Sequence, residues 1–530
     1  MVFDRFLVVA TLAVLVSCGK GVDGTGETGE TSTTTDTTDT TDTSTGTETG
    51  STVVTPPAGL DLVSVDVDKF AELGYELATY ELGEDYEVQY TTLTGARPFF
   101  HVFRPIGGTT DSLDILMWFH GGHIGNDEVE IPNNCSDETI RYNINLILGT
   151  GSMVTGFVSE RNWALVIPSN NWCDGGVGLG SDDPVDPENH WGWVHSKNVL
   201  DLATGGYLGF NAGGELYSWG TSAGATSSAT AAYRYTGFTG MIVDSGGCDQ
   251  FLMHDRDPGI MSHIFGGDPY LPDGTESQFF SNYQEASCTW QVANGLQAPI
   301  FIPYNQEDLA VPIEQPQALL AILEEHYPSA GINYGSHDYN HLSPGGNYHV
   351  QTRSKIIPFG YSTGLMMQFL EGNSIYWREA EWGCWSQDCS VGTVRVGGED
   401  WQNYSNAGGV EITSEEDSGT AMHSRLDPNI DNGDTVEAVI VLKALELADV
   451  DDLTEVLRMT YTDNSGTSER VFTAGDFAPE SQATDQEFLD QYLDSRLTFV
   501  PEDVDSGYVS LDYLGAGAFR LDAIVFVVSK

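Results

Sequence analysis

The chain has 530 residues, 40% of them hydrophobic, so it is long enough to form two domains that each bury a core. Its 78 acidic and 21 basic residues give a formal net charge of -57, which argues against nucleic acid and anionic membrane surfaces as partners. Because the acidic residues are spread along the chain and form no single block, we interpret them as a solvated acidic surface.

The N-terminus has the pattern of an export signal. Arg5 precedes an apolar run, Phe6–Val16, which is too short to cross a bilayer and has the length of a signal-peptide core. The run ends in Leu-Val-Ser-Cys at residues 15–18, which resembles the lipobox of bacterial lipoproteins. That resemblance implies a signal peptide over residues 1–18, lipidation of Cys18 and a membrane anchor through the lipid, with Gly19 favouring the outer membrane or cell surface. An ordinary secretory signal is the alternative.

Residues 19–57 consist mainly of Thr, Asp, Glu, Ser and Gly, with almost nothing apolar before Val53. Such a segment cannot bury enough surface to offset the entropy of ordering its backbone. We therefore predict a disordered tether between the membrane anchor and the globular part of the chain.

Between residues 58 and 373, short apolar runs alternate with segments of helical character. Tyr86–Leu93 and Phe99–Phe103 are predicted to pair as a hairpin. Buried strands are predicted at Leu113–Phe119, Trp163–Pro168, Leu216–Trp219, Gly240–Asp244 and Ala298–Tyr304, and helices at 139–159, 194–203 and 315–326. This alternation predicts an α/β fold with a mostly parallel sheet and helices on both faces.

The strand Leu216–Trp219 leads into Gly-Thr-Ser-Ala-Gly at residues 220–224, a G-x-S-x-G motif. A stretch rich in Ala, Thr and Ser follows without Gly or Pro as far as Tyr233, and is expected to be helical. A serine on a sharp turn between a strand and a helix is the arrangement of a nucleophile elbow. Ser222 is therefore the predicted nucleophile, and the small residues Gly220 and Gly224 keep the turn free of collisions with the strand and helix.

Four motifs together resemble the α/β-hydrolase superfamily, in particular exported carboxylesterases such as feruloyl esterases and polyhydroxybutyrate depolymerases. The motifs are ILMWFHGGH at 115–123, GTSAG at 220–224, IFIPYNQEDLAVP at 300–312 and HLSPGG at 341–346. The resemblance implies a catalytic domain over residues 58–373, a triad in the chain order Ser, Asp, His, and a lid or cap between Ser245 and Gln297.

The triad acid is predicted to be Asp308. It follows the apolar strand Ile300–Tyr304 after a short turn and precedes Val311-Pro312, as the acid does in the family that the chain resembles. Glu307 is the competing acid, and a structural aspartate in a turn is the alternative without function.

Three histidines, His337, His341 and His349, are candidates for the base. The sequence around His341 is similar to the H-x-x-P-G-G motif at the catalytic histidine of depolymerases, which favours His341. A final strand should precede this histidine, and Gly331–Gly335 is a poor strand by its sequence.

The oxyanion hole needs backbone N–H groups directed at the negative oxygen of the tetrahedral intermediate. Ala223, directly after the nucleophile, supplies one by its position, and the His-Gly-Gly turn supplies the second, with Gly122 favoured over Gly121 and His123. His120 and His123 could instead suggest a metal, but turn histidines are the commoner explanation, so neither a metal nor a cofactor is expected.

Six cysteines remain besides Cys18, an even number that is typical of an exported protein with disulfides. Proximity in sequence suggests the pairs Cys135–Cys173, Cys248–Cys288 and Cys384–Cys389. No C-x-x-C or Cys/His cluster resembles a zinc site.

From residue 374 to residue 530, short alternating runs are separated by Gly, Asp and Asn turns, which predicts an antiparallel β-sandwich or jelly roll. The predicted strands are Gly392–Val396, Val436–Leu442, Val456–Tyr461, Leu497–Val500, Tyr508–Tyr513 and Phe519–Val528. The last of them resembles the final strand of carbohydrate-binding modules, and a packing domain without a ligand is the alternative.

These observations predict a serine esterase that forms an acyl-enzyme at the cell surface. Its substrate is an ester, and the sequence leaves open whether that ester is a small molecule, a polymer or one linked to a polysaccharide. Two alternatives stay open. One is a serine peptidase of the same fold, because a triad does not distinguish esters from amides. The other is a non-catalytic surface protein that binds glycans.

Overall fold

The computed structural model describes residues 57–83, 99–120, 148, 153–168, 191–235, 237–292, 298–304, 308, 311–326, 334–338, 366–379, 389–396, 408–447, 450–477 and 495–529. The predicted signal peptide with Cys18, the predicted tether up to residue 56 and the predicted strand Tyr86–Leu93 lie outside these residues. Within them, none of the helices combines the length and apolar character that a bilayer crossing requires.

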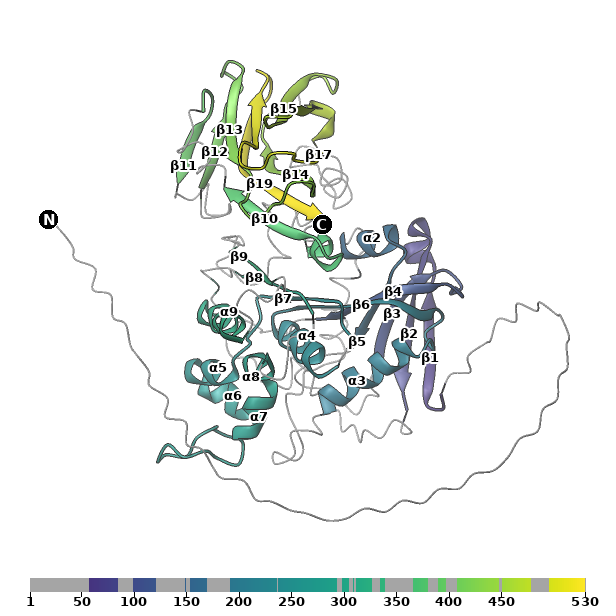
Figure 1. The fold of residues 1–530 in the computed structure, drawn as a ribbon. Coiled ribbons are helices and arrows are strands. Elements are labelled where there is room, and N and C mark those ends of the chain that lie inside the picture. The colour runs from purple at the N-terminus through teal and green to yellow at the C-terminus, as the bar shows by residue number, and fades with distance from the viewer. Residues whose placement is uncertain are drawn as a thin grey trace, which may run out of the picture. The chain divides into compact units, whose positions relative to one another are not determined.

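A nine-stranded mixed sheet forms the first part of the fold, with the strand order β1-β2-β3-β5-β4-β6-β7-β8-β9 (Figure 1). Its strands are β1 Leu60–Asp66, β2 Tyr75–Leu82, β3 Phe99–Pro105, β4 Ser112–Phe119, β5 Ala164–Pro168, β6 Asn211–Thr221, β7 Gly240–Asp244, β8 Ile300–Tyr304 and β9 Tyr334–Asp338. The pairs from β1 to β5 through β2 and β3 are antiparallel, and all pairs from β5 to β9 are parallel. The carboxyl ends of β4 to β9 therefore lie at one edge of the sheet.

Alternate residues of the central strand β4 face opposite sides of the sheet, as the pleat requires. Leu116 and Trp118 belong to one buried core cluster, together with Phe157 of helix α2 (Met153–Glu160). Met117 and Phe119 belong to a second cluster on the other side. Helices α3 (Trp191–Thr204), α4 (Ala223–Arg234) and α9 (Glu314–His326) contribute to that second cluster. Helices thus cover both faces, with α2 on one and α3 and α4 on the other (Figure 1).

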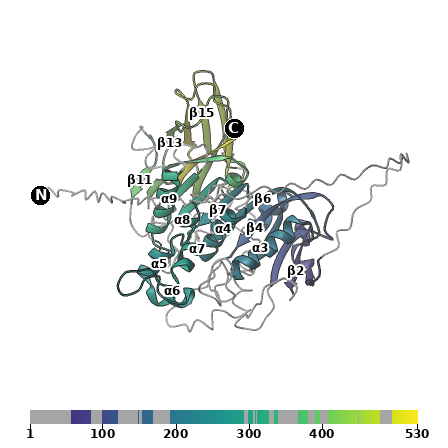
Figure 2. The same ribbon diagram turned by 60° about the horizontal axis from the view of Figure 1, so that its bottom comes forward.

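A group of short helices fills the segment between β7 and β8, where the sequence predicts a cap. It consists of α5 Gln250–Arg256, α6 Pro258–Phe265, α7 Phe280–Ala286 and α8 Cys288–Gln291. Helices α5, α6 and α7 lie side by side in both views (Figure 2). Met261, Phe265, Tyr283 and Ala286 form a small core of their own, so the group is a compact subdomain.

The C-terminal part contains two antiparallel sheets. The six-stranded sheet consists of β10 Ser374–Glu379, β11 Thr393–Val396, β12 Gly408–Ile412, β14 Thr435–Ala444, β17 Arg496–Phe499 and β19 Phe519–Ser529. The four-stranded sheet consists of β13 Gly419–Arg425, β15 Glu455–Thr462, β16 Thr467–Thr473 and β18 Tyr508–Tyr513. Residues from both sheets, among them Ile440, Phe526, Met459 and Leu511, share one buried core cluster. Two antiparallel sheets over a common core agree with the predicted all-β region.

Two 3-10 helices within the described ranges have local roles. η1 (Asp68–Leu73) joins β1 to β2 and ends at Gly74, whose φ of 71° is the left-handed conformation that glycine adopts readily. η9 (Ala474–Asp476) follows β16 and carries a capping box between Thr473 and Asp476.

A buried ion pair fastens the antiparallel side of the nine-stranded sheet. Arg104 Nε of β3 donates to Glu76 Oε1 of β2 at 2.9 Å, and the two side chains are 9% and 5% exposed. The other oxygen of Glu76 accepts from the backbone of Gly107 at 2.9 Å, and Arg104 Nη1 also donates to Tyr80 Oη at 2.7 Å. Removing one partner would leave the other charge buried without compensation.

We expect Glu76→Ala to lower the free energy of unfolding by about 3–5 kcal/mol, because the Arg104 guanidinium stays buried. The half-exposed pair Lys197–Asp201 on α3 is the matched control, and Lys197→Ala should change stability by less than about 0.5 kcal/mol. Urea denaturation of the two variants and the wild type measures the difference. Equal effects of both substitutions would contradict the structural role of the buried pair.

Candidate active site

Ser222 lies on the turn between the end of β6 at Thr221 and the start of α4 at Ala223. Its backbone angles are φ 57° and ψ -125°, a conformation that residues other than glycine adopt only where the surroundings enforce it. The backbone N–H of Ser222 donates to the carbonyl oxygen of Asp244 on the neighbouring strand β7 at 2.9 Å, and Ala225 N donates to Ser222 O at 2.9 Å. The predicted serine therefore occupies a strained strand-to-helix turn, the geometry of a nucleophile elbow.

Two glycines allow this turn. A Cβ at Gly220 would overlap the backbone of Gly224, and a Cβ at Gly224 would overlap the carbonyl oxygen of Phe119 at the end of β4. Helix α4 thus lies almost in backbone contact with β6 and β4. The sequence-based argument for small residues at both positions is confirmed.

Small polar residues continue the close packing of α4 on the sheet. Ser218 Oγ of β6 and Ser228 Oγ of α4 lie 2.5 Å apart, and Ser228 Oγ donates to the carbonyl oxygen of Ile242 on β7 at 3.1 Å. Every residue from Gly224 to Tyr233 is buried. The Ala-, Thr- and Ser-rich composition of this segment therefore serves a helix that approaches two strands closely.

Ala223, the predicted first donor of the oxyanion hole, is the first residue of α4. Backbone N–H groups in the first turn of a helix have no intrahelical acceptor, and the helix dipole favours negative charge there. The second predicted donor, Gly122, lies outside the described residues, whereas His120 just before it is buried at 1% exposure.

Asp308, the predicted triad acid, follows β8 by four residues, since β8 ends at Tyr304. Its side chain accepts a hydrogen bond from the backbone N–H of Val311 at 2.8 Å, and the residue is 7% exposed. The carboxyl ends of parallel strands share one edge, so Asp308 lies at the same edge of the sheet as Ser222. Glu307, the competing acid, lies outside the described residues.

A second carboxyl group, which the sequence motifs did not indicate, lies at this edge of the sheet. Asp244 is the last residue of β7 and pairs with Thr221 of β6, directly beside the nucleophile turn. It is fully buried, and burial raises its pKa to about 8, with a further contribution from the negative charge of Asp308. The sequence does contain a signal for this residue, because Asp244 is an acidic residue at the end of the otherwise apolar strand β7.

The predicted base lies beyond the described residues. His341 and His349 follow β9, whose last residue is Asp338, and they are not among the residues that the structure describes. His337 lies within β9, opposite Pro303 of β8. The presence of β9 corrects the expectation that the sequence before His341 makes a poor strand. Two residues separate His341 from the end of β9, at the edge of the sheet that also holds Ser222.

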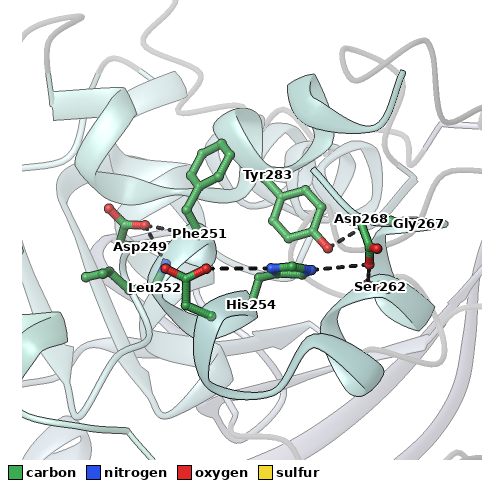
Figure 3. Close-up of polar contacts among 9 residues, drawn as sticks. Asp249, Phe251, Leu252, His254, Ser262, Gly267, Asp268 and Tyr283 are labelled. Atoms are coloured by element: carbon green, nitrogen blue, oxygen red, sulfur yellow. Dashed lines mark hydrogen bonds and ion pairs between the residues drawn. The ribbon is translucent and has the colours of Figure 1, made fainter. Parts of the chain in front are cut away.

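A second group of Ser, Asp and His side chains lies in the helices between β7 and β8 (Figure 3). His254 Nε2 contacts Asp268 Oδ1 at 3.3 Å, and Ser262 Oγ donates to the same oxygen. These hydrogen bonds, with that of Ser262 the largest contribution, lower the pKa of Asp268. Because serine and imidazole both bind the carboxylate, the imidazole is not placed to take the proton of Ser262, and the group does not have the order of a catalytic triad.

The neighbouring contacts in Figure 3 give this group a structural role. Tyr283 Oη donates to the carbonyl oxygen of Gly267 at 3.1 Å, and its ring packs edge-on against His254. Asp249 caps α5 by accepting from the backbone N–H groups of Phe251 and Leu252 at 3.0 and 3.1 Å. The cluster therefore ties the short helices to one another.

The predicted disulfide between Cys248 and Cys288 is wrong, because both residues are free thiols in the structure. The pair is buried, and the backbone N–H of Thr289 donates to the carbonyl oxygen of Cys248 at 3.2 Å. Burial, followed by a hydrogen bond with Cys248, raises the pKa of the Cys288 thiol. The two side chains do lie close together, as their proximity in sequence suggested, but as hydrogen-bonded thiols. Cys135, Cys173 and Cys384 lie outside the described residues.

No protein-family model and no curated protein matches this chain. Solved structures are similar in fold only. An S-formylglutathione hydrolase from Agrobacterium tumefaciens is 12% identical, with 52% of this chain and 89% of that chain covered at a TM-score of 0.35. An acetyl xylan esterase from Paenibacillus sp. R4 is 12% identical, with 60% and 89% covered at a TM-score of 0.40.

An acylaminoacyl peptidase from Pyrococcus horikoshii is 12% identical, with 56% of this chain and 47% of that chain covered at a TM-score of 0.35.

The mixed sheet of this chain resembles that of an α/β-hydrolase. The shared features are the order of the strands, the helices on both faces and the strained serine after β6. Within the described residues, no group of three or more His, Cys, Asp or Glu side chains has the arrangement of a metal site.

We expect Gly224→Ala to lower the free energy of unfolding by about 2–3 kcal/mol, because the added Cβ meets the backbone of Phe119. The same displacement should slow the reaction of Ser222 with a fluorophosphonate, measured by mass spectrometry. Gly247→Ala is the matched control, since its Cβ would meet the flexible side chain of Met253 at ordinary distances, 3.5 Å to Cγ and 3.6 Å to Sδ. A Gly224→Ala variant as stable and as reactive as the control would refute the close packing of α4.

Proposed function

We propose that this protein is a serine hydrolase that cleaves carboxylic esters through an acyl-enzyme intermediate, with Ser222 as the nucleophile. The observation that supports it most is the backbone of Ser222, held at φ 57° between β6 and the N-terminus of α4. A strained turn at this place serves to present a hydroxyl group beside backbone N–H groups that can stabilise an oxyanion.

In the acylation step, Ser222 Oγ forms a bond to the carbonyl carbon of the ester while its proton moves to the imidazole of His341. The electron pair of the carbonyl shifts to oxygen, where the backbone N–H groups of Ala223 and Gly122 stabilise the negative charge. The tetrahedral intermediate then collapses, and the alcohol departs with the proton from the imidazolium. Asp308 holds the imidazole in the required tautomer and stabilises its positive charge.

Deacylation repeats these steps with water in place of serine. His341 takes a proton from water, the hydroxide adds to the acyl carbon, and Ser222 leaves with the proton as the acid is released. Loss of one oxyanion donor costs about 3 kcal/mol of transition-state stabilisation in such enzymes.

We further propose that the enzyme works at the cell surface as an outer-membrane lipoprotein, anchored through Cys18 and separated from the membrane by the tether 19–57. The feruloyl esterase and polyhydroxybutyrate depolymerase type remains the proposed subtype, with a polymeric or polysaccharide-linked ester as substrate. A jelly-roll topology for the C-terminal region and the disulfides Cys135–Cys173 and Cys384–Cys389 are proposed from the sequence alone.

Hydrolysis of p-nitrophenyl butyrate by the full-length protein tests the proposal. Ser222→Ala should lower kcat/KM by about 10⁴-fold or more, because it removes the nucleophile. Ser262→Ala is the control, since Ser262 belongs to the structural cluster of α5 to α7, and it should retain the wild-type rate. Cleavage of the matching p-nitroanilide at a higher rate would favour a peptidase, and hydrolysis that survives Ser222→Ala would contradict the proposal.

The identity of the base can be tested with three separate substitutions to alanine, at His337, His341 and His349. His341→Ala should lower kcat/KM by about as much as Ser222→Ala, because members of a triad act as one unit. The other two substitutions should have effects at least about tenfold smaller. The same ester assay measures all three variants, and a larger loss at His349 or His337 would transfer the role to that residue.

A further inference from the structure

Asp244 is a carboxyl group without exposure at the centre of the candidate active site. Its backbone oxygen accepts the hydrogen bond from Ser222 N at 2.9 Å that holds the nucleophile turn. Its side chain accepts from Ser245 Oγ at 3.2 Å and from Thr221 Oγ1 at 3.5 Å. Asp244 therefore bridges the residue before the nucleophile and the residue that begins the next turn.

Three neighbouring groups have the largest effects on the pKa of Asp244 after burial itself. The hydroxyl group of Thr221 faces it from β6, that of Ser245 from its own turn, and the carboxyl group of Asp308 from the segment after β8. The first two are neutral, and the third carries the same charge sign as an ionised Asp244. None of these three groups is a cation.

Two buried carboxyl groups at one site favour a state with a single negative charge. Asp308 accepts from a backbone N–H, that of Val311 at 2.8 Å, and such a donor can stabilise only an acceptor. The partners of Asp244 are hydroxyl groups, which can reverse their hydrogen bonds and accept from a protonated acid. Asp244 is also more deeply buried than Asp308, with 0% against 7% exposure. The hydroxyl partners of Asp244 and its complete burial both favour the protonated, neutral form of this residue.

We propose that Asp244 is a positioning residue for the proposed ester hydrolysis. It is kept as a neutral carboxylic acid, so that it adds no negative charge beside the turn of Ser222. The inference rests on the proposed function. Asp244 holds Thr221 and the turn of Ser222 in place through its hydrogen bonds. Because it is neutral, it neither repels the oxyanion nor attracts the imidazolium.

A pH dependence follows. Burial raises the pKa of Asp244 to about 8, so the residue is neutral at pH 7 and ionises above pH 8. In the wild type, kcat/KM should then fall by about tenfold between pH 8 and pH 10, because the second negative charge opposes the oxyanion in a site of low dielectric constant. An Asp244→Asn variant should lack this fall, because asparagine is close in shape to the neutral acid and cannot ionise.

The test compares kcat/KM for p-nitrophenyl butyrate from pH 6 to pH 10 in the full-length wild type, Asp244→Asn and Asp244→Ala. Asp244→Ala should be at least tenfold slower at pH 7, whereas Asp244→Asn should recover most of that loss and lack the fall above pH 8. Asp249→Asn is the matched control, because Asn caps a helix as well as Asp does, and it should keep the fall.

A second measurement does not depend on activity. An aspartate whose pKa is raised by folding is more protonated in the folded state, so its contribution to stability declines as pH rises from about 4 to about 8 and is constant above that. The free energy of unfolding should therefore decline less over this window in Asp244→Asn than in the wild type, and Asp249→Asn should follow the wild type.

The outcomes separate the two proposals. If the wild type hydrolyses no ester, the proposed function fails, and the positioning role fails with it. If the wild type is active but Asp244→Asn coincides with it in either the rate profile or the stability profile, the inference about Asp244 alone is overturned.

Discussion

The close contact between α4 and the strands beneath it is the constraint on which the rest of the site depends. A helix can start directly after β6 only if Gly220 and Gly224 have no Cβ, and the chain must then pass through a positive φ at Ser222. The strain of that residue is offset by the hydrogen bonds of its backbone and by the burial of residues 224–233 of α4. The backbone of Ser222, and with it the direction of its Cα–Cβ bond, is thereby fixed by the packing of α4 on the sheet.

The parallel half of the sheet then decides which side chains can meet this serine. Strands β6, β7, β8 and β9 end at one edge in consecutive order, so each adds one residue or loop to the same place. β6 provides Ser222, β7 provides Asp244, and the turn after β8 provides Asp308. Two of these are carboxyl groups, and burial makes a double negative charge expensive, so their protonation states must be treated together.

The sequence predicted those features that have a local signal. The central strands could be located because β4, β5, β7 and β8 are short apolar runs, and Ser222 because a glycine pair surrounds it. β9 was missed, since its residues Tyr334–Asp338 include a glycine and polar side chains, and pairing with β8 stabilises it instead of its own propensity. Asp244 was missed for a similar reason, because only the folded sheet buries it beside Ser222 and Asp308.

The helices between β7 and β8 show why residue types alone do not make an active site. Ser262, Asp268 and His254 are the same three kinds of residue as a triad, and they are in contact (Figure 3). The carboxylate takes both hydrogen bonds there, however, so proton transfer from serine to imidazole has no path, and Asp268 is largely exposed to solvent. At Ser222 a strained turn, a helix N-terminus and buried acids coincide. It is the backbone geometry, a positive φ at the start of a helix, that distinguishes the candidate nucleophile from an ordinary serine with acidic neighbours.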